Sequence, residues 1–149
     1  MNSVRPMQEF HINFVIDLLL EESVKAALHL EDAPRKSREK SLRKNLRDRD
    51  EANFILYRGA DPAGWLKLNG LEGDMLWISS LAVHPMYQRQ GIGSFAVRYA
   101  EWYAREKGFG RMGMGIHTTP DNLPARACYE VLGYTLTEET HQLTYIKRL

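Results

Sequence analysis

Apolar residues recur with helical spacing in the first third of the chain. The positions that fall on one helical face are Phe10, Phe14, Leu18, Val24 and Leu28. This spacing predicts a helical segment that begins near Glu9 and is ended by Ala33 and Pro34. A second, mostly exposed helix is predicted over residues 35–50, where Leu42 and Leu46 form the clearest apolar pair at i, i+4 spacing.

The pattern then changes to short runs rich in β-favouring residues, separated by turn residues. Strands are predicted over residues 53–58, 64–69, 75–83, 111–117, 134–136 and 142–147, with a short, less distinct strand over 2–6. The one long helical pattern in this part covers residues 92–106, where apolar residues return to helical spacing. The expected architecture is therefore a meander of strands followed by an alternation of helices and strands.

A turn with two glycines connects the strand over 75–83 to the helix over 92–106. Pro85 stops the strand because it lacks an N–H donor, and it holds His84 extended. Gly91 and Gly93 then lie where the helix begins, so a ligand can approach the unpaired N–H groups at the positive end of the helix dipole. This arrangement favours a pyrophosphate-binding turn, while the alternative for two glycines alone is an ordinary tight turn.

The spacing of this turn excludes two common nucleotide motifs. Residues 88–93 read Q-R-Q-G-I-G, which is not G-x-G-x-x-G, and no G-x-x-x-x-G-K-[ST] occurs anywhere in the chain. The segment resembles instead the GNAT superfamily of acyl-CoA-dependent N-acyltransferases, whose pyrophosphate turn reads [QR]-x-x-G-x-[GA] after a strand of the form L-x-V-x-P. The matching residues are Leu81, Val83, Pro85, Gln88, Gly91 and Gly93.

A second match to the same family follows in the segment N-L-P-A-R-A-C-Y-E-V-L-G-Y. The residues that fit the family pattern N-x-x-A-x-x-x-Y-E-x-x-G-[FY] are Asn122, Ala125, Tyr129, Glu130, Gly133 and Tyr134. Asp121 or Asn122 is a suitable helix N-cap, Pro124 is tolerated in the first turn, and Gly133 is suited to ending the helix. Two motifs in the family's order make chance resemblance a poor explanation.

The resemblance implies an α/β fold of the GNAT type, with a mixed sheet of about seven strands flanked by about four helices. It also implies acetyl-CoA as co-substrate, with no metal. The residues that it places against acetyl-CoA are Leu81, Ala82, Val83, Gln88, Arg89, Gln90, Gly91, Ile92, Gly93, Ser94, Asn122 and Tyr129. In such enzymes the strands corresponding to residues 75–83 and 112–117 splay apart, so that the pantetheine arm pairs with exposed backbone.

The resemblance further implies direct attack of an amine on the thioester, through a tetrahedral intermediate. A backbone N–H near Val83 would polarise the thioester carbonyl, and Tyr129 would protonate the leaving thiolate, because a phenol is a donor at neutral pH. The alternative for Tyr129 is an ordinary core aromatic. No carboxylate occupies an obvious position for a general base. His117 is the candidate base, and a solvent-facing histidine at a strand end is the alternative.

Composition agrees with one compact domain over residues 1–149. The chain is 44% hydrophobic and 26% charged, with a formal net charge of +1. No segment has the ~20 apolar residues of a membrane span, and the N-terminus does not resemble a secretory signal, so we expect a cytoplasmic protein without membrane contact. The single cysteine, Cys128, allows neither an internal disulfide nor a zinc cluster and is expected to be a buried, inert thiol.

The charged segment over residues 35–50 raises the question of nucleic-acid binding. Its basic residues are largely offset by neighbouring acidic ones, so a solvated helix face is favoured and no nucleic-acid partner is expected. The expected partners are acetyl-CoA and an amine acceptor. The family resemblance also implies that a homodimer can form, and the residue pattern gives no information on this point. Four aromatic residues could line an acceptor pocket or fill the core: Phe54, Tyr57, Trp65 and Trp77.

Three functional hypotheses follow. The first is an acetyl-CoA-dependent N-acetyltransferase that acts on a primary amine, with a small amine slightly favoured over a protein. The second is a non-catalytic acyl-CoA-binding sensor or interaction module, which the missing strand carboxylate motivates. The third is a nucleotide-binding protein of another class, which the absent nucleotide fingerprints disfavour.

Overall fold

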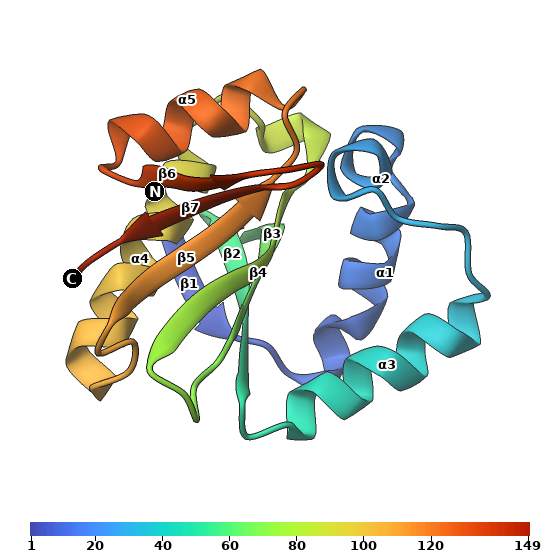
Figure 1. Cartoon of the computed structure of the whole chain (residues 1–149). Coiled ribbons are helices and arrows are strands. Elements are labelled where there is room, and N and C mark those ends of the chain that lie inside the picture. The colour runs from blue at the N-terminus through green and yellow to red at the C-terminus, as the bar shows by residue number, and fades with distance from the viewer.

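A single sheet of seven strands runs through the molecule and is covered by helices on both faces (Figure 1). The computed structural model describes residues 1–149. The strands are β1 (Asn2–Pro6), β2 (Glu51–Arg58), β3 (Asp61–Asn69), β4 (Met75–Val83), β5 (Gly113–Thr118), β6 (Thr135–Glu139) and β7 (Leu143–Lys147). Their order in the sheet is β1-β2-β3-β4-β5-β7-β6, and every neighbouring pair is antiparallel except β4 and β5. The expected seven-stranded mixed sheet is confirmed.

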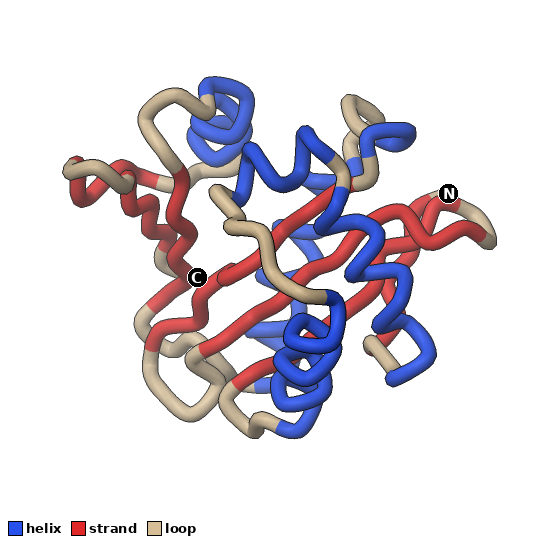
Figure 2. Tube along the Cα trace, turned by 90° about the vertical axis from the view of Figure 1, so that its right-hand side faces the viewer, coloured by secondary structure: helices blue, strands red, loops and turns tan.

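Five α-helices and two 3₁₀ turns complete the fold. The helices are α1 (Ile12–Leu20), α2 (Glu22–Leu28), α3 (Arg35–Arg47), α4 (Ile92–Lys107) and α5 (Leu123–Val131), and the 3₁₀ turns are η1 (Glu9–His11) and η2 (Pro85–Tyr87). The first three helices lie together on one side of the sheet, at the right of Figure 1 and in front of the strands in Figure 2. Helices α4 and α5 contribute to the core on the opposite face.

Two separate hydrophobic clusters result from this layering. Alternation along β2 sends Phe54 and Leu56 to the cluster beneath α4, whereas Ile55 and Tyr57 join the cluster beneath α1, α2 and α3. These aromatic residues are therefore buried in the core, as is Trp65, which packs on the α1–α3 face. Of the four aromatic candidates for an acceptor pocket, only Trp77 lies in neither cluster.

A β-bulge at Ser79 reverses the alternation within β4. Lys67 pairs with Ser80 and Leu68 pairs with Ile78, so Ser79 is the extra residue. Before the bulge, Leu76 and Ile78 belong to the α4-side cluster; after it, Ala82 belongs to the opposite cluster. A strand without this bulge would place Ile78 and Ala82 on the same face. The bulge therefore determines which residues of the predicted ligand strand face each side of the sheet.

The first helical segment differs from the expectation of one continuous helix. Glu21 is extended, with φ −64° and ψ 132°, and separates α1 from α2. The second segment ends at Leu28, where His29 takes a left-handed conformation with φ 53°, before Ala33 and Pro34 are reached. No glycine or proline marks either point in the sequence. The break raises the number of α-helices from the expected four to five and brings the end of α2 over the carboxyl ends of β4 and β5.

Buried His11 makes the stability of the fold depend on pH. Its Nδ1 accepts a hydrogen bond from the Gln8 N–H at 2.9 Å, and its Nε2 lies 2.8 Å from the Tyr57 hydroxyl. Burial, with a smaller contribution from the positive charge of Arg5, lowers the pKa of His11 below its ordinary value of 6.5. The unfolded chain therefore binds a proton near pH 6.5, whereas the folded chain binds it only at lower pH.

We expect the free energy of unfolding to fall as the pH decreases from about 6.5 through the lower, folded-state pKa of His11. Urea denaturation at pH 7.5 and pH 5.5 measures this loss, which should be smaller in a His11→Gln variant. A matched His141→Gln variant, with the substitution at an exposed position, should keep the pH dependence of the unaltered chain. Equal pH dependence in all three proteins would contradict the assignment to His11.

Candidate functional site

Strands β4 and β5 separate part of the way along their length. Their parallel pairing runs from Met75 opposite Gly113 to Ile78 opposite Ile116 and then stops. Strand β4 continues to Val83, so from Ser79 onward its edge towards β5 has no strand partner. The strand separation that the family resemblance implies is present, and it leaves backbone N–H and C=O groups available to a ligand.

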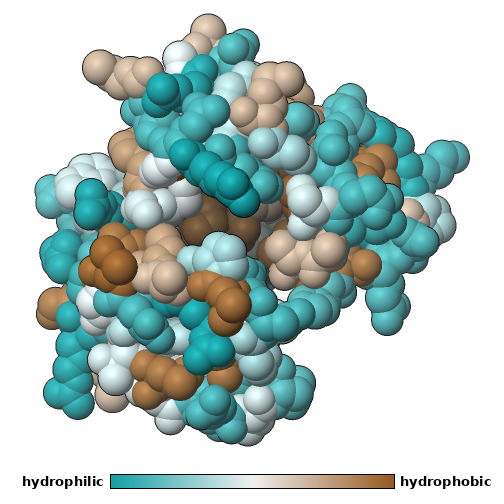
Figure 3. All heavy atoms as spheres, turned by 90° about the horizontal axis from the view of Figure 1, so that it is seen from above, coloured by the Kyte–Doolittle hydropathy of each residue, from teal (hydrophilic) through white to brown (hydrophobic).

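A cleft of about 780 Å³ occupies this gap. It is lined by the end of α2 and the next residue (Ala27, Leu28, His29), β3 and β4 (Asn69, Trp77, Ile78, Ser79, Ser80, Leu81), β5 and the following loop (Ile116, His117, Thr118, Thr119), α5 and its N-cap (Asn122, Tyr129) and the β6–β7 loop (His141, Gln142). Seen from above, the surface is hollowed near its centre, with hydrophobic side chains at the bottom of the hollow (Figure 3).

Tyr129 reaches the cleft from the α4–α5 side of the sheet. The side chain is 8% exposed and packs edge-on against Tyr145, with ring centroids 5.8 Å apart. The neighbouring phenols of Tyr134 and Tyr145 donate hydrogen bonds to Glu101 and Glu130, whereas the Tyr129 hydroxyl has no such partner. Burial raises the pKa of Tyr129 well above its ordinary value of 10, with smaller contributions from Cys128 and Tyr145. The phenol is therefore protonated at neutral pH.

Asn122 holds the start of the helix that carries Tyr129. Its side-chain oxygen accepts a hydrogen bond from the Ala125 N–H at 3.3 Å, which confirms the predicted N-cap. Cys128 precedes Tyr129 on the helix and is only half-buried, so the expectation of a buried thiol was wrong. Its Sγ lies 3.4 Å from the Ser94 Oγ in the first turn of α4. This contact joins α5 to the glycine-bearing turn.

His117 reaches the cleft from the opposite face of the sheet. The ring stacks on Trp77, with centroids 4.7 Å apart and planes 11° apart, and its Nδ1 lies 3.0 Å from the Thr144 Oγ1. The stacking requires Gly115, the cross-strand partner of Trp77, because a Cβ at that position would lie 2.3 Å from the indole ring. When Nδ1 donates to Thr144, Nε2 remains a bare acceptor.

The glycine-bearing turn lies directly after β4 and holds an unusual backbone conformation. Gly91 and Arg89 have left-handed φ values of 79° and 62°, and the Gln88 side chain donates a hydrogen bond to the Val83 carbonyl at 3.0 Å. Nothing lies within 4 Å of a Cβ built on Gly91 or Gly93. The turn therefore presents the free N–H groups of the first turn of α4 to open space.

The structure brings together some of the predicted site residues and separates others. Leu81, His117, Asn122 and Tyr129 line the cleft. The predicted residues from Gln88 to Ser94 form the adjoining turn and the start of α4, outside the cleft wall. Val83 packs on the α4-side cluster and Ala82 joins the opposite one, as adjacent residues of a strand do.

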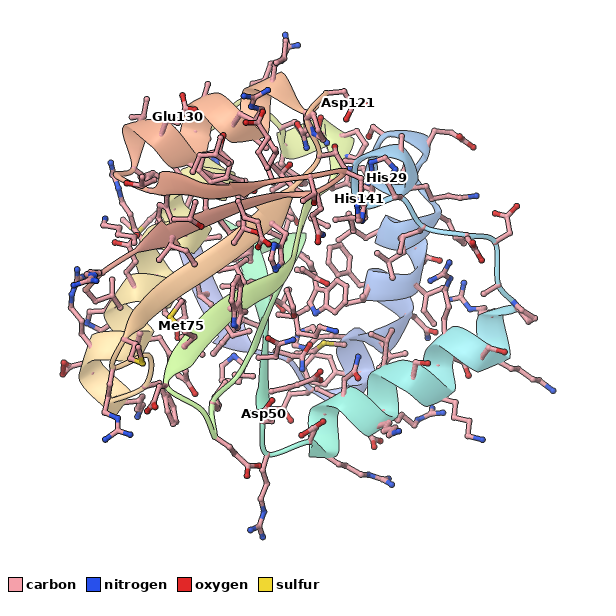
Figure 4. All side chains as sticks on the ribbon, in the orientation of Figure 1. His29, Asp50, Met75, Asp121, Glu130 and His141 are labelled. Carbon is pink, nitrogen blue, oxygen red and sulfur yellow. The ribbon has the colours of Figure 1, made fainter.

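Several cleft residues carry no recognisable signal in the sequence. His29 and His141 come from the end of α2 and the β6–β7 loop and lie at the same end of the molecule (Figure 4). Ser79 and Ser80 enter the wall because of the bulge. Glu72 and Asp74, in the turn between β3 and β4, do not line the cleft, and Asp74 pairs with Arg111 at 2.6 Å.

The cleft wall contains three histidines and no carboxylate. No group of three or more histidine, cysteine or acidic side chains is arranged to hold a metal ion. None of the helices has the length and apolar character needed to cross a bilayer. The polar side chains that line the cleft are a phenol, imidazoles, hydroxyls, carboxamides and an indole.

Comparison with known proteins assigns this arrangement to a family. The model of the Acetyltransferase (GNAT) family matches residues 13–134, so the chain belongs to the GNAT acetyltransferases. No curated protein sequence matches the chain. The family resemblance inferred from the two motifs is thereby confirmed.

Solved structures of similar shape cover nearly the whole chain at low identity. A domain from Methanocaldococcus jannaschii has a TM-score of 0.86 at 12% identity, covering 100% of this chain and 99% of that one. The Salmonella typhimurium acetyl transferase that modifies the N-terminal serine of a 50S ribosomal subunit protein has a TM-score of 0.83 at 17% identity, covering 99% and 95%. The Vibrio cholerae spermidine N-acetyltransferase, solved with CoA and spermine, has a TM-score of 0.81 at 14% identity, covering 97% and 92%. At these sequence identities, the structural similarity shows a shared fold and nothing about a shared substrate.

Proposed function

We propose that residues 1–149 form a single N-acetyltransferase domain that transfers the acetyl group of acetyl-CoA to a primary amine. The observation that carries the proposal is the gap between β4 and β5, with Tyr129 on one face of the sheet and His117 on the other. A thioester held in this gap would be accessible to an acid from one side and to an amine from the other. Family membership and the fold support acetyl transfer.

The α4–α5 side has the features needed to hold acetyl-CoA. Open space above Gly91 and Gly93 leaves room for a pyrophosphate at the positive end of the 16-residue helix α4. The unpaired edge of β4 from Ser79 to Val83 can pair with the amide groups of the pantetheine arm. Binding of this kind depends on backbone more than on side chains, so Leu81, Ala82 and Val83 would contribute through their peptide groups.

The proposed reaction uses a base and an acid on opposite sides of the gap. The acceptor nitrogen attacks the thioester carbon, and the Nε2 of His117 takes the proton that the nitrogen loses. A backbone N–H near Val83 stabilises the developing oxyanion. As the carbon–sulfur bond breaks, the Tyr129 hydroxyl gives its proton to the sulfur, and CoA leaves as the thiol.

A non-catalytic acyl-CoA sensor remains the second candidate, because no carboxylate lines the cleft to serve as a base. Calorimetry with acetyl-CoA, CoA, ATP and NAD, followed by detection of free thiol after addition of amines, separates the candidates. Selective acetyl-CoA binding with amine-dependent thiol release supports the enzyme. Binding without release with any amine supports the sensor, and an absence of CoA binding contradicts both.

A Gly93→Asp substitution should separate cofactor binding from folding. The new Cβ enters open space, and an acidic side chain in the first turn of α4 interacts favourably with the helix dipole, so the stability should be unchanged or higher. The same carboxylate would repel the pyrophosphate. We expect acetyl-CoA affinity measured by calorimetry to fall at least about tenfold.

Gly93→Ala is the matched control, since it adds a Cβ without charge and should improve the helix by up to about 1 kcal/mol. Its acetyl-CoA affinity should stay well above that of Gly93→Asp. Equal affinity of the aspartate variant and the unaltered chain would place the pyrophosphate elsewhere.

A further inference from the structure

A second pocket lies under α3, next to the cleft. Its volume is about 390 Å³, and it shares Leu28, Ser79 and Ser80 with the cleft wall. Its other lining residues come from α1, the α2–α3 loop, α3 and β3: Leu19, Leu30, Ala33, Ser37, Arg38, Ser41, Leu42, Asn45, Trp65 and Lys67. The two cavities therefore border each other at the bulge of β4.

The pocket lies on the acceptor side of the proposed active site. Trp65 and Leu42 belong to the α1–α3 cluster, whereas the pyrophosphate turn leads into α4, whose buried residues belong to the opposite cluster. An acetyl-CoA bound at that turn reaches the gap from the α4–α5 side. A molecule in the pocket under α3 reaches the same gap from the other side, where His117 stacks on Trp77.

The charges of the pocket are all positive. Arg38 and Lys67 line it, and no aspartate or glutamate does. The Nη2 of Arg38 donates to the Glu31 carbonyl at 2.6 Å, but its Nε is buried and has no hydrogen-bond partner. Behind the pocket wall, the Lys67 ammonium forms a long ion pair with Glu51 at 3.9 Å, a distance that leaves its hydrogen-bond donors available to a closer anion. The Arg38 guanidinium therefore lies at the pocket wall without a carboxylate partner, which favours an anionic ligand group.

The rest of the lining suits a short apolar chain beside that anion. Leu19, Leu42 and Trp65 provide apolar surface, and serine hydroxyls lie where the pocket borders the cleft. A polycation such as spermidine would find no carboxylate in either cavity to bind its ammonium groups. The charges that line the two cavities therefore favour an amine with an anionic group over a polycationic amine.

We propose that the acceptor is an amine that also carries a carboxylate, which Arg38 and Lys67 bind in the pocket under α3. The apolar stem lies against Leu42 and Trp65, and the amine emerges at Ser79 and Ser80, next to the proposed thioester site. This inference rests on the proposed acetyl transfer, and it adds the chemical class of the acceptor.

Omega-amino acids compared with their neutral amides test the proposal, because the two amines have similar basicity and differ in charge at the far end. The probes are 4-aminobutyrate, 5-aminopentanoate and 6-aminohexanoate, their three amides, and spermidine. Thiol release at saturating acetyl-CoA gives kcat/KM for each. We expect at least one acid to exceed its amide by about tenfold or more, the effect of one charged hydrogen bond.

Arg38→Gln and Lys67→Gln should each lower kcat/KM for the acid more than for its amide, mainly through a higher KM for the acid. Arg38 also donates a hydrogen bond to the Glu31 carbonyl, so Arg38→Gln alone would not separate loss of carboxylate binding from loss of this hydrogen bond. Lys67→Gln leaves that hydrogen bond in place. Arg43→Gln is the matched control, since Arg43 lies on α3 but outside the pocket. Its preference should equal that of the unaltered chain.

Three results would overturn the proposal: equal kcat/KM for acids and amides, a preference for spermidine, or no acetylation of any acid. Calorimetry with acetyl-CoA on the same samples shows whether acetyl transfer itself has failed. If acetyl-CoA binds and the amides or spermidine are acetylated, only the assignment of the acceptor class is wrong. If acetyl-CoA does not bind, the proposed function is wrong as well.

Discussion

Replacing Tyr129 by phenylalanine is expected to lower kcat by about 10²- to 10⁴-fold, the usual contribution of a positioned general acid. The substitution removes one hydroxyl from a side chain that lines the cleft and keeps the ring that packs on Tyr145. The fold and the affinity for acetyl-CoA should therefore change little. Steady-state kinetics of thiol release and calorimetry with acetyl-CoA provide the two measurements.

Tyr145→Phe provides the comparison, because that phenol belongs to the same aromatic group but donates to Glu130 outside the cleft. Its kcat should stay within a few-fold of the unaltered value. A Tyr129→Phe protein with full activity would remove the phenol from the mechanism. Equal losses in both variants would indicate that packing of the aromatic group, rather than proton donation, controls the rate.

Replacing Lys147 by methionine should cause the largest loss of stability among surface-accessible positions of the α4 side. The Lys147 ammonium contacts Glu101 at 3.1 Å and the Leu132 carbonyl at 2.8 Å, while the Tyr134 hydroxyl donates to the other Glu101 oxygen at 2.9 Å. Glu101 is 5% exposed. Without the lysine, this buried carboxylate keeps one neutral donor. We expect a loss of about 2–3 kcal/mol, below the range for a fully buried pair because the lysine is partly exposed.

Urea denaturation at pH 7 measures the effect, with Lys40→Met as the control at an exposed position of α3. That control should change the free energy of unfolding by less than about 0.5 kcal/mol. Adding Glu101→Gln to the Lys147→Met protein should recover part of the loss, since the amide carries no unpaired charge. A Lys147→Met protein as stable as the unaltered chain would show that water solvates Glu101.

Local patterns predicted the limits of several elements correctly. The strand from Met75 to Val83 and the short strand from Asn2 to Pro6 have the predicted limits, and α4 is only one residue longer than expected. The strand from Met75 to Val83 and helix α4 have strong periodicity and clear ends, such as Pro85 and the glycines that flank α4. The motif around Tyr129 gave the helix and its cap because the Asn122 interaction spans three residues.

Features that depend on contacts between distant segments were not predicted. The bulge at Ser79 is a register shift between β3 and β4, and neither strand contains a glycine at that point. The stacking of Trp77 on His117 depends on Gly115 in another strand. In the sequence, Arg38 resembles its neighbours on a charged helix. Only its position on α3, across a pocket from β3 and β4, distinguishes it. Charge along a helix predicts exposure on average, not which residue faces a pocket.

The two hydrophobic clusters have no buried residue in common. Substitutions in one cluster and in the other should therefore have nearly additive effects on stability, because the side chains share no contacts. One cluster supports the turn and helices that we propose hold acetyl-CoA, and the other supports the wall of the pocket under α3. During evolution, the choice of acceptor could therefore diverge through changes in α1, α2 and α3 while the machinery for acetyl-CoA stayed constant.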